Sequence, residues 1–464
     1  MKSTTKRAYA LYALVAFFMA GIIFFVSTLT INASDWALSR YNKHIYDGNT
    51  LNVAGSIFDS KGELLVGTQD GKRVYNESAA VRKATLHAIG DSDGYISTGI
   101  QSVYSDELIG YNFINGIYSI SKFGTGNNIR LTLDADVCVT ALNALNGRKG
   151  TVGVYNYTTG EIICMVSSPT YDPENKPTEA IEKNANGKYD GIYLNRFLSG
   201  VYTPGSVFKA ITCVSAVNNI SDIFSQTFYC DGSIDIPGGG EVKCSGVHGT
   251  VTFKDAFAHS CNCAFATIAN ELGADALAET ANELGFNRSF KMGDTVIAKS
   301  SFDVSSVNNT DLAWAGIGQY TTLLNPYHMM MIMGAIANSG NPASPYVVKS
   351  IETPDGKVID EAKTQNVGQL IEPATADIVR DMMRYNVTSY YKDWRFPGLE
   401  LAGKTGTAEL DGNQESHAWF TGFSTKEDCP LAFVVIVENG GAGFSQAMPI
   451  ANTVMQAAYK SISE

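Results

Sequence analysis

The chain has 464 residues, of which 45% are hydrophobic and 17% are charged, and its formal net charge is −12 at pH 7. This composition excludes an intrinsically disordered chain and predicts a globular protein with a sizeable hydrophobic core. The acidic balance, without any basic patch in the sequence, excludes nucleic acid as an expected partner. The length allows more than one domain.

An uncharged run from Ala8 to Ile31 is long enough to cross a bilayer, which needs about 20 apolar residues. Lysine and arginine precede this run, so the positive-inside rule places the N-terminus in the cytoplasm. We therefore predict a cell-membrane protein with a cytoplasmic tail over residues 1–7, a single-pass transmembrane anchor over 8–31 and an extracytoplasmic remainder. A cleaved signal peptide is the alternative, but the run is long and no small-residue cleavage site follows it.

Residues 32–128 are predicted to form a small α+β pedestal domain between the membrane and the rest of the chain. Within it, residues 53–65 indicate a strand, a turn and a second strand, because Asp59-Ser60-Lys61-Gly62 is a turn signal between apolar segments. Residues 66–128 are rich in Gly and Tyr and show weak periodicity, so no further elements are predicted there.

Residues 129–464 are predicted to form one α+β domain. Asp134 is expected to cap a helix that runs to about Leu145. Strands are expected at 150–157, 161–167, 418–423 and 431–438, and helical patterns dominate 205–290, 326–338 and 448–461. Strands at both ends of the domain with helices between them predict a sheet in which the first hairpin pairs with the last strands.

The pattern Ser-x-x-Lys occurs at Ser3, Ser119, Ser206 and Ser389, and its context favours Ser206. Ser206 follows a Thr-Pro-Gly turn and precedes an apolar run, so Lys209 is expected one helical turn away on the same face. A serine becomes nucleophilic when a nearby base takes its proton, and a lysine is such a base only when neutral. We predict Ser206 as nucleophile and Lys209 as base, with a capping serine and a solvated lysine as the alternative.

A second pair of polar residues is expected beside that lysine. In Ser260-Cys261-Asn262, the Ser260 hydroxyl can relay a proton, and the Asn262 amide can anchor Lys209 and hold a substrate carbonyl. Ser306-Val307-Asn308 matches the same pattern, but an apolar segment suited to bury the motif follows Ser260. A polar helix cap is the alternative for Ser260.

Lys404-Thr405-Gly406-Thr407 follows a strand-like lead. Lys404 and Thr405 are predicted to bind a carboxylate, and Gly406 to let a substrate backbone lie close to the strand. The Thr407 N–H is predicted to form an oxyanion hole with the N–H of Ser206. Lys404 is also the positive neighbour that would favour a neutral Lys209. An edge strand with an exposed lysine is the alternative.

The chain has eight cysteines and six histidines. Cys230 and Cys244 bracket a Gly-rich loop, and an extracytoplasmic location permits a disulfide between them, which the sequence leaves open. A zinc site built from Cys230, Cys244, Cys261 and Cys263 lacks any C-x-x-C pair, and the histidines show no ligand spacing. We therefore expect no metal and no cofactor.

The motifs, in this order, resemble those of the class B penicillin-binding proteins, monofunctional D,D-transpeptidases of the serine β-lactamase-like superfamily. The resemblance covers nearly the whole chain, although Ala54 stands where the family usually has Arg. Further matching segments are Gly55–Asp59, Leu131–Asp134, Ser168–Pro173, Asn195-Arg196, Ile317–Gln319, Ala337–Gly340 and His417–Phe420.

This resemblance implies a penicillin-binding transpeptidase domain, a five-stranded antiparallel sheet flanked by helices, carried on the pedestal and the membrane helix. It implies that Ser206 forms an acyl-enzyme with the D-alanyl-D-alanine end of a peptidoglycan stem peptide. A neighbouring stem amine then accepts the acyl group, and D-alanine is released. β-Lactams would acylate the same serine, and a polytopic membrane glycan polymerase is the expected partner.

Three alternatives remain beside the transpeptidase. A D,D-carboxypeptidase differs only in using water to resolve the acyl-enzyme. A β-lactamase of class A needs a glutamate that activates water, and neither Glu279 nor Glu283 begins a Glu-x-x-Leu-Asn segment. A non-catalytic β-lactam sensor or wall scaffold is disfavoured by the complete motifs. Pro204 and Phe208 exclude the G-x-S-x-G elbow of an α/β-hydrolase.

Overall fold

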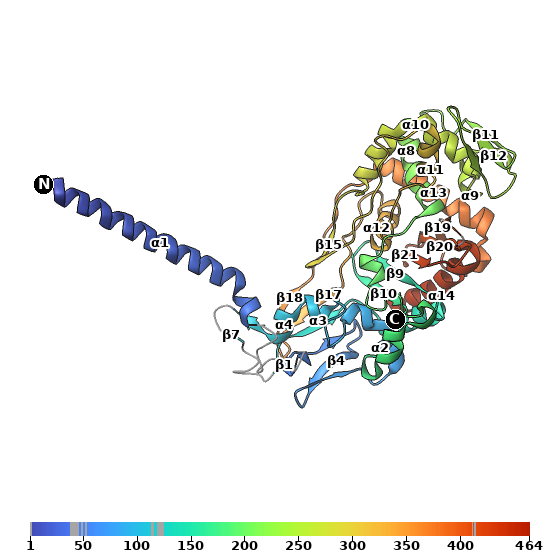
Figure 1. Cartoon of the computed structure of the whole chain (residues 1–464). Coiled ribbons are helices and arrows are strands. Elements are labelled where there is room, and N and C mark those ends of the chain that lie inside the picture. The colour runs from blue at the N-terminus through green and yellow to red at the C-terminus, as the bar shows by residue number, and fades with distance from the viewer. Residues whose placement is uncertain are drawn as a thin grey trace.

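The computed structural model describes residues 2–37, 46–47, 50–51, 53–112, 116–117, 125–410, 412 and 414–464. Some of the predicted pedestal therefore lies outside the described residues, as does the Ser-x-x-Lys match at Ser119. Figure 1 shows a long N-terminal helix, a smaller sheet next to it and a larger helix-covered sheet beyond.

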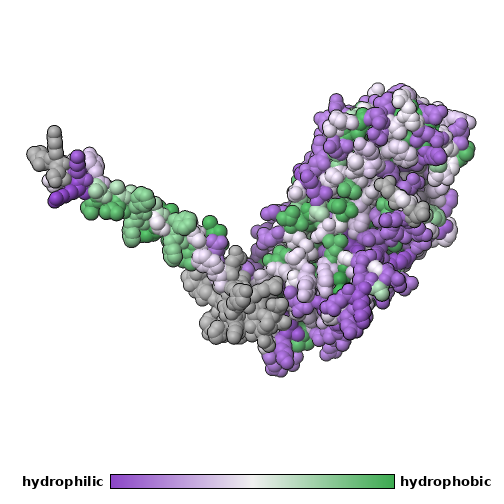
Figure 2. All heavy atoms as spheres, viewed as in Figure 1, coloured by the Kyte–Doolittle hydropathy of each residue, from purple (hydrophilic) through white to green (hydrophobic). Residues whose placement is uncertain are grey.

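Helix α1 (Lys2–Ala37) stands apart from the rest of the described chain (Figure 1). Its segment Thr4–Ala33 reaches a mean hydropathy of 2.4. The apolar side chains are exposed along the helix, as the hydrophobic colouring in Figure 2 shows, and Phe17 is 82% exposed. Water disfavours such a surface, whereas the hydrocarbon of a bilayer favours it. Helix α1 thus has the length and composition of the single-pass anchor predicted over 8–31.

The smaller sheet contains six strands in the order β18-β17-β8-β3-β4-β5. The strands are β3 (Ile57–Phe58), β4 (Leu64–Gln69), β5 (Lys72–Tyr75), β8 (Asn128–Leu131), β17 (Val348–Glu352) and β18 (Val358–Glu361). The predicted strand–turn–strand is confirmed, since β3 pairs antiparallel with β4 and the Asp59 carboxylate accepts the N–H groups of Lys61 and Glu63. Three strands come from beyond residue 127, so the sheet crosses the predicted boundary at 128, and the domain division stays a prediction.

Short elements surround this smaller sheet. The helices are α2 (Ala79–Ile89), α3 (Ile100–Val103) and α4 (Ser105–Ile109), and the strand pairs are β1 (Tyr46–Asp47) with β2 (Thr50–Leu51) and β6 (Tyr111–Asn112) with β7 (Gly116–Ile117). Most buried apolar residues of this region belong to the same continuous core as those of the larger sheet, whereas Leu86 and Ile96 form a small second cluster with Tyr171 and Ile192. The two parts of the body are therefore packed against each other.

The larger sheet has five antiparallel strands in the order β10-β9-β21-β20-β19. They are β9 (Gly150–Asn156), β10 (Ile162–Ser168), β19 (Leu401–Ala408), β20 (His417–Ser424) and β21 (Leu431–Val437). The predicted return of the first hairpin to the last strands is confirmed by the pairing of β9 with β21, for example Val152 with Val435. Every residue of β21 is buried, as its run of apolar residues requires when helices cover both faces.

Helices cover both faces of the larger sheet (Figure 1). Helices α5 (Ala135–Leu145) and α14 (Gly443–Ser463) pack together against it, and α12 (Pro326–Ala337) packs from the other side with α13 (Pro373–Tyr385). The predicted capping of α5 is confirmed, because the Asp134 carboxylate accepts the N–H groups of Asp136 and Val137.

The region at 205–290 contains more strand than the sequence predicts. Helices α8 (Lys209–Asn219), α9 (Phe253–Ala258) and α10 (Asn262–Glu283) are present as expected. The expectation of helix is wrong at 227–252, where two antiparallel strand pairs form instead: β11 (Thr227–Cys230) with β14 (Gly249–Thr252), and between them in sequence the hairpin of β12 (Ser233–Asp235) with β13 (Glu241–Lys243). The run Pro237–Gly240 joins β12 to β13, and a proline followed by glycines disfavours a helix there.

Several short elements complete the described part of the larger body. They are α6 (Thr178–Lys183), α7 (Arg196–Ser199), α11 (Asn309–Gly316), β15 (Lys291–Met292) and β16 (Thr295–Val296). A 3₁₀ turn, η4 (Gly205–Phe208), and a π-helical turn, η5 (Asn386–Tyr391), lie next to β19. These two turns bring polar side chains to the edge of the larger sheet.

Candidate active site

Ser206 lies in the 3₁₀ turn η4, which continues directly into α8. Gly205 has a φ of +55° and donates its N–H to the carbonyl of Gly318 at 2.8 Å. A Cβ built on Gly205 would lie 2.6 Å from the carbonyl oxygen of Thr407, so a glycine is needed for η4 to pack this closely on β19. The neighbouring strand β20 also holds the turn, because the Trp419 indole donates to the carbonyl of Thr203 at 3.0 Å.

The amine of Lys209 connects the first two predicted motifs. Its Nζ lies 2.7 Å from Ser206 Oγ, 2.8 Å from Asn262 Oδ1 and 3.4 Å from Ser260 Oγ. The Lys209 side chain is fully buried, and its Nζ lies 5.7 Å from the centre of the Phe265 ring. The structure therefore brings together the four residues predicted to carry the chemistry.

Burial changes the protonation of both lysines. It lowers the pKa of Lys209 from 10.5 to about 8, because the charged ammonium loses its water. It also lowers the pKa of Lys404 strongly, and repulsion from Lys209 adds to that shift. From the sequence we expected both burial and the charge of Lys404 to keep Lys209 neutral. In the structure burial is the main cause of the lowered Lys209 pKa, and the repulsion between the two lysines lowers chiefly the pKa of Lys404.

Ser260 and Asn262 lie at the junction of α9 and α10. Ser260 has a φ of +56°, a conformation that costs energy for any residue other than glycine and is found at functional sites. Asn262 is the first residue of α10, and its Nδ2 donates to the carbonyl of Lys243 at 2.9 Å. This hydrogen bond turns the Asn262 side-chain oxygen toward Lys209. In the competing match, Ser306-Val307-Asn308, the Asn308 side chain caps α11 instead.

Strand β19 carries the third motif at the edge of the larger sheet. The Thr405 N–H donates to Tyr391 Oη at 3.1 Å, so it points away from the neighbouring strand. Backbone groups alternate along a strand, so the Thr407 N–H points the same way. The Lys404 side chain is buried beneath the strand, where its Nζ donates to the carbonyl of Thr405 at 3.0 Å. The alternative of an exposed edge lysine is therefore wrong.

Gly406 has a role in packing that the sequence did not predict. A Cβ on Gly406 would lie 2.9 Å from the carbonyl oxygen of Pro204 and 3.0 Å from Val207 Cγ1. The turn that carries Ser206 thus lies against this glycine, and the predicted approach of a substrate backbone stays a prediction. Gly406 and Gly205 together allow η4 and β19 to pack closely.

A cleft of about 790 Å³ lies over these residues. Its lining includes Ser206, Ser260, Asn262, Thr405 and Thr407, so all three motifs open into one space. Aromatic side chains line the same cleft: Trp314, Tyr390, Tyr391 and Phe444. The two buried lysines lie beneath this lining, where they can act on a bound acyl group through the residues that contact it.

Some residues of this region were not predicted from the sequence. Tyr391 holds Thr405 through both its backbone and its hydroxyl, with Oη 3.0 Å from Thr405 Oγ1. Close to the cleft, Cys230, Cys244, His248 and Cys261 place four potential metal-binding atoms within 4.8 Å of one another. The zinc site weighed in the sequence analysis had Cys263 as its fourth ligand, whereas His248 takes that place in the structure. All eight cysteines are free, so the disulfide left open between Cys230 and Cys244 is not formed.

Comparison with known proteins identifies the family. Residues 150–456 match the family model described as the penicillin binding protein transpeptidase domain. The chain is 29% identical to the peptidoglycan D,D-transpeptidase PbpA of Mycolicibacterium smegmatis, with 79% of this chain and 80% of the relative covered. It is 30% identical to PbpA of Mycobacterium tuberculosis, with 67% of each chain covered.

Solved structures have the same fold. The ceftriaxone acyl-enzyme complex of penicillin-binding protein A from M. tuberculosis superposes with a TM-score of 0.78 at 27% identity, covering 87% of this chain and 98% of that one. A D,D-transpeptidase domain from Eggerthella lenta superposes with a TM-score of 0.74 at 27% identity, covering 88% and 98%. With the family match over residues 150–456 and the convergence of three motifs on one cleft, this chain belongs to the penicillin-binding protein transpeptidase family.

Proposed function

We propose that this protein is a membrane-anchored peptidoglycan D,D-transpeptidase in which Ser206 is the acylated nucleophile. The observation that carries the proposal is the contact of 2.7 Å between Lys209 Nζ and Ser206 Oγ, made by a fully buried amine beneath an open cleft. A buried lysine is neutral more readily than an exposed one, and a neutral amine at this distance can accept the hydroxyl proton.

In the first half of the reaction, Lys209 takes the proton of Ser206 while Oγ attacks the carbonyl carbon of the penultimate D-alanine. The N–H groups of Ser206 and Thr407 stabilise the oxyanion that develops. The C–N bond then breaks, and the proton passes from Lys209 through Ser260 Oγ, 3.4 Å away, to the leaving amine. Free D-alanine departs, and the stem peptide remains as an ester on Ser206.

In the second half, the amine of a neighbouring stem peptide attacks the ester carbonyl. Lys209 accepts a proton from that amine, and the serine oxygen leaves with the proton held by Lys209. The new amide is the cross-link, and the enzyme returns to its starting state. Asn262 keeps Lys209 in place through its side-chain oxygen at 2.8 Å during both steps.

The third motif is proposed to hold the terminal carboxylate of the donor. Burial raises the pKa of Tyr391 to about 12, so its hydroxyl is neutral and retains its hydrogen. That oxygen accepts the Thr405 N–H, and its hydrogen is available for Thr405 Oγ1. The Thr405 hydroxyl hydrogen is then free to point into the cleft toward a carboxylate, while Lys404 supplies positive charge from below when it is protonated.

β-Lactams are proposed to acylate Ser206 in the same way. Structures of penicillin-binding protein A from M. tuberculosis are described as acyl-enzyme complexes with ceftriaxone, imipenem and penicillin G. With a labelled penicillin, intact-mass measurement should show one adduct on the wild-type protein and none on Ser206→Ala. The same stoichiometric adduct on Ser206→Ala would remove Ser206 as the nucleophile.

The decisive test of the activity uses a stem-peptide donor ending in D-alanyl-D-alanine, with and without an amine acceptor. The wild-type protein should release D-alanine and form a cross-linked product when the acceptor is present, and Ser206→Ala should do neither. Release of D-alanine without any cross-linked product would show a carboxypeptidase instead.

Helix α1 is proposed to cross the membrane once, with the N-terminus in the cytoplasm and the cleft outside. The hydropathy of Thr4–Ala33 and the basic residues before it support this orientation. In intact protoplasts, a membrane-impermeant maleimide should label Lys72→Cys above the wild-type background and should label Thr4→Cys only after permeabilisation. The reverse pattern would contradict the orientation.

A polytopic glycan polymerase is proposed to bind α1 and the smaller sheet. The exposed apolar surface of α1 provides a surface on which another membrane helix can pack. The polymerase should co-purify with the full chain and should be lost when α1 is replaced by an unrelated membrane helix. Equal recovery with both chains would place the contact elsewhere.

A further inference from the structure

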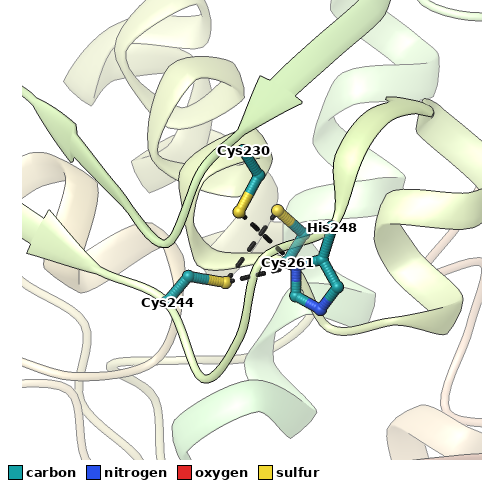
Figure 3. A group of neighbouring side chains, drawn as sticks. All are labelled: Cys230, Cys244, His248 and Cys261. Atoms are coloured by element: carbon teal, nitrogen blue, oxygen red, sulfur yellow. Dashed lines mark hydrogen bonds between the residues drawn. The ribbon is translucent and has the colours of Figure 1, made fainter.

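Four side chains from separate segments meet beside the second motif. Cys230 ends β11, Cys244 follows β13, His248 precedes β14, and Cys261 caps α10 (Figure 3). His248 Nδ1 lies 3.5 Å from Cys230 Sγ and 3.5 Å from Cys244 Sγ, and Cys244 Sγ lies 4.0 Å from Cys261 Sγ. The four donor atoms all lie within 4.8 Å of one another.

These separations match the edges of a tetrahedron around a zinc ion. Zinc binds thiolate sulfur at about 2.3 Å and imidazole nitrogen at about 2.0 Å, which gives edges of about 3.8 Å between two sulfurs and about 3.5 Å between sulfur and nitrogen. A disulfide needs its sulfurs about 2.05 Å apart, so the thiols are arranged for a common ligand and not for a bond to each other.

A metal here would link small elements of the fold. The segments that supply the four residues lie in or beside two two-stranded sheets, β11 with β14 and β12 with β13, and a two-stranded sheet is marginally stable alone. A metal bound by residues beside both strand pairs and by the N-cap of α10 would join the three elements. The binding free energy would then contribute directly to the stability of this region.

We propose that Cys230, Cys244, His248 and Cys261 form a closed structural site for Zn²⁺. On binding, the three thiols lose their protons to solvent, and the neutral imidazole binds through Nδ1, which leaves a complex of net charge −1. Three soft thiolates and one imidazole are ligands typical of zinc, and the set contains no oxygen ligand of the kind that magnesium and calcium prefer.

The site is joined to the catalytic motif by the chain itself. Cys261 lies between Ser260 and Asn262, and the Asn262 N–H donates to Cys244 Sγ at 3.2 Å. Lys243, which precedes Cys244, accepts the Asn262 side-chain amide through its carbonyl. Hydrogen bonds from backbone N–H groups to ligand atoms are common around metal centres and fix their orientation. Zinc would therefore hold Asn262 in the position from which it contacts Lys209.

Metal content of the full chain tests the site without reference to activity. Protein purified in detergent without a histidine tag, from cells supplied with zinc, should contain about one zinc per chain. X-ray absorption should show three sulfur neighbours at about 2.3 Å and one nitrogen at about 2.0 Å. A zinc-free wild-type protein, or a Cys230–Cys244 disulfide found by mass spectrometry, would overturn the proposal whatever the variants do.

Two ligand variants and one matched control sharpen that test. Cys230→Ser and His248→Ala should each lose most of the bound zinc. Cys429→Ser removes a buried thiol outside the cluster and should keep it. Full zinc retention by both ligand variants would overturn the assignment of the ligands.

The positioning role has its own readout. Removing zinc from the wild-type protein with a strong chelator should lower the rate constant of acylation by a fluorescent penicillin at least about 10-fold, while prior noncovalent binding changes less. Added Zn²⁺ should restore the rate. Zinc-free protein that is acylated at the wild-type rate would show that the metal does not position Asn262.

Discussion

Gly205 lies so close to Thr407 that a Cβ on the glycine would be 2.6 Å from the threonine carbonyl oxygen. Through this approach the turn that carries Ser206 packs directly on the edge of β19. The two proposed donors of the oxyanion hole belong to these two segments, so their geometry depends on Gly205 having no side chain, as it does on Gly406 having none.

Gly205→Ala should therefore slow acylation more than an alanine at another glycine of positive φ does. The substitution adds both the cost of a φ of +55° and a clash with backbone, and a displacement of about 1 Å at a reacting group can cost about 100-fold in rate. We expect acylation by labelled penicillin to slow by about that factor. Gly147→Ala is the control, because Gly147 has a φ of +75° with nothing within 4 Å of its built Cβ. Equal effects of the two changes would contradict the proposed packing role.

The rate of acylation should depend on the protonation of Lys209. Its pKa is lowered to about 8, and only the neutral amine can accept the Ser206 proton. The rate constant should rise with pH through a midpoint near 8 and then level off. The measurement is acylation by a fluorescent penicillin over a pH series on both sides of this midpoint. Lys209→Arg stays charged at every such pH and should be inactive throughout, and near-normal acylation by it would remove lysine as the base.

The same shift predicts how stability depends on pH. Because the folded-state pKa of Lys209 lies below its unfolded value of 10.5, the native chain releases this proton before the unfolded chain does. The contribution of Lys209 to the free energy of unfolding is thus least favourable below about pH 8 and increases from there to about pH 10.5. Lys209→Met should lose this increase in denaturant titrations, and an unchanged slope in Lys209→Met would assign the effect to other groups.

Tyr391→Phe should weaken the third motif. The change removes the acceptor of the part-buried Thr405 N–H and the partner of Thr405 Oγ1, and loss of a hydrogen bond costs about 0.5–1.5 kcal/mol. We expect acylation efficiency to fall about 10-fold, measured as the second-order rate constant with penicillin. Tyr390→Phe, at a side chain that is 45% exposed, should have little effect. A similar loss of acylation efficiency in both variants would assign the effect to the aromatic lining of the cleft and not to the contacts with Thr405.

Arg196→Ala should destabilise the part of the chain built around the larger sheet, although Arg196 does not line the cleft. Its guanidinium is 3% exposed, lies 2.7 Å from Glu438 Oε1 and donates to the carbonyls of Asp190 and Gly191. Loss of one partner of such a buried pair leaves the other charge uncompensated and costs about 3–5 kcal/mol. Denaturant unfolding followed by tryptophan fluorescence should show this loss. Lys183→Ala, in an exposed pair with Glu179, should change stability by less than about 0.5 kcal/mol.

Local patterns predicted the larger sheet and the meeting of the candidate site residues well. The apolar run of β21 predicts a buried strand, and the Thr-Pro-Gly turn predicts that a helix starts near Ser206, so Ser206 and Lys209 could be placed on one helical face without coordinates. Tyr391 could not, because its role arises where a π-helical turn meets an edge strand that is close in space and carries no signal in sequence. His248 was missed for a similar reason. Its partners lie 4, 13 and 18 positions away on segments of different type, which matches no familiar ligand spacing.

The smaller sheet has a consequence for how the chain matures. Strand β8 pairs with β3 on one side and with β17, which begins at Val348, on the other. During synthesis the first strands are made long before β17 is available, and their free edge can pair with other chains until it arrives. The smaller sheet is therefore completed only after the segment between β8 and β17 has been made, so a chain truncated before Val348 would keep a free strand edge and be prone to aggregation.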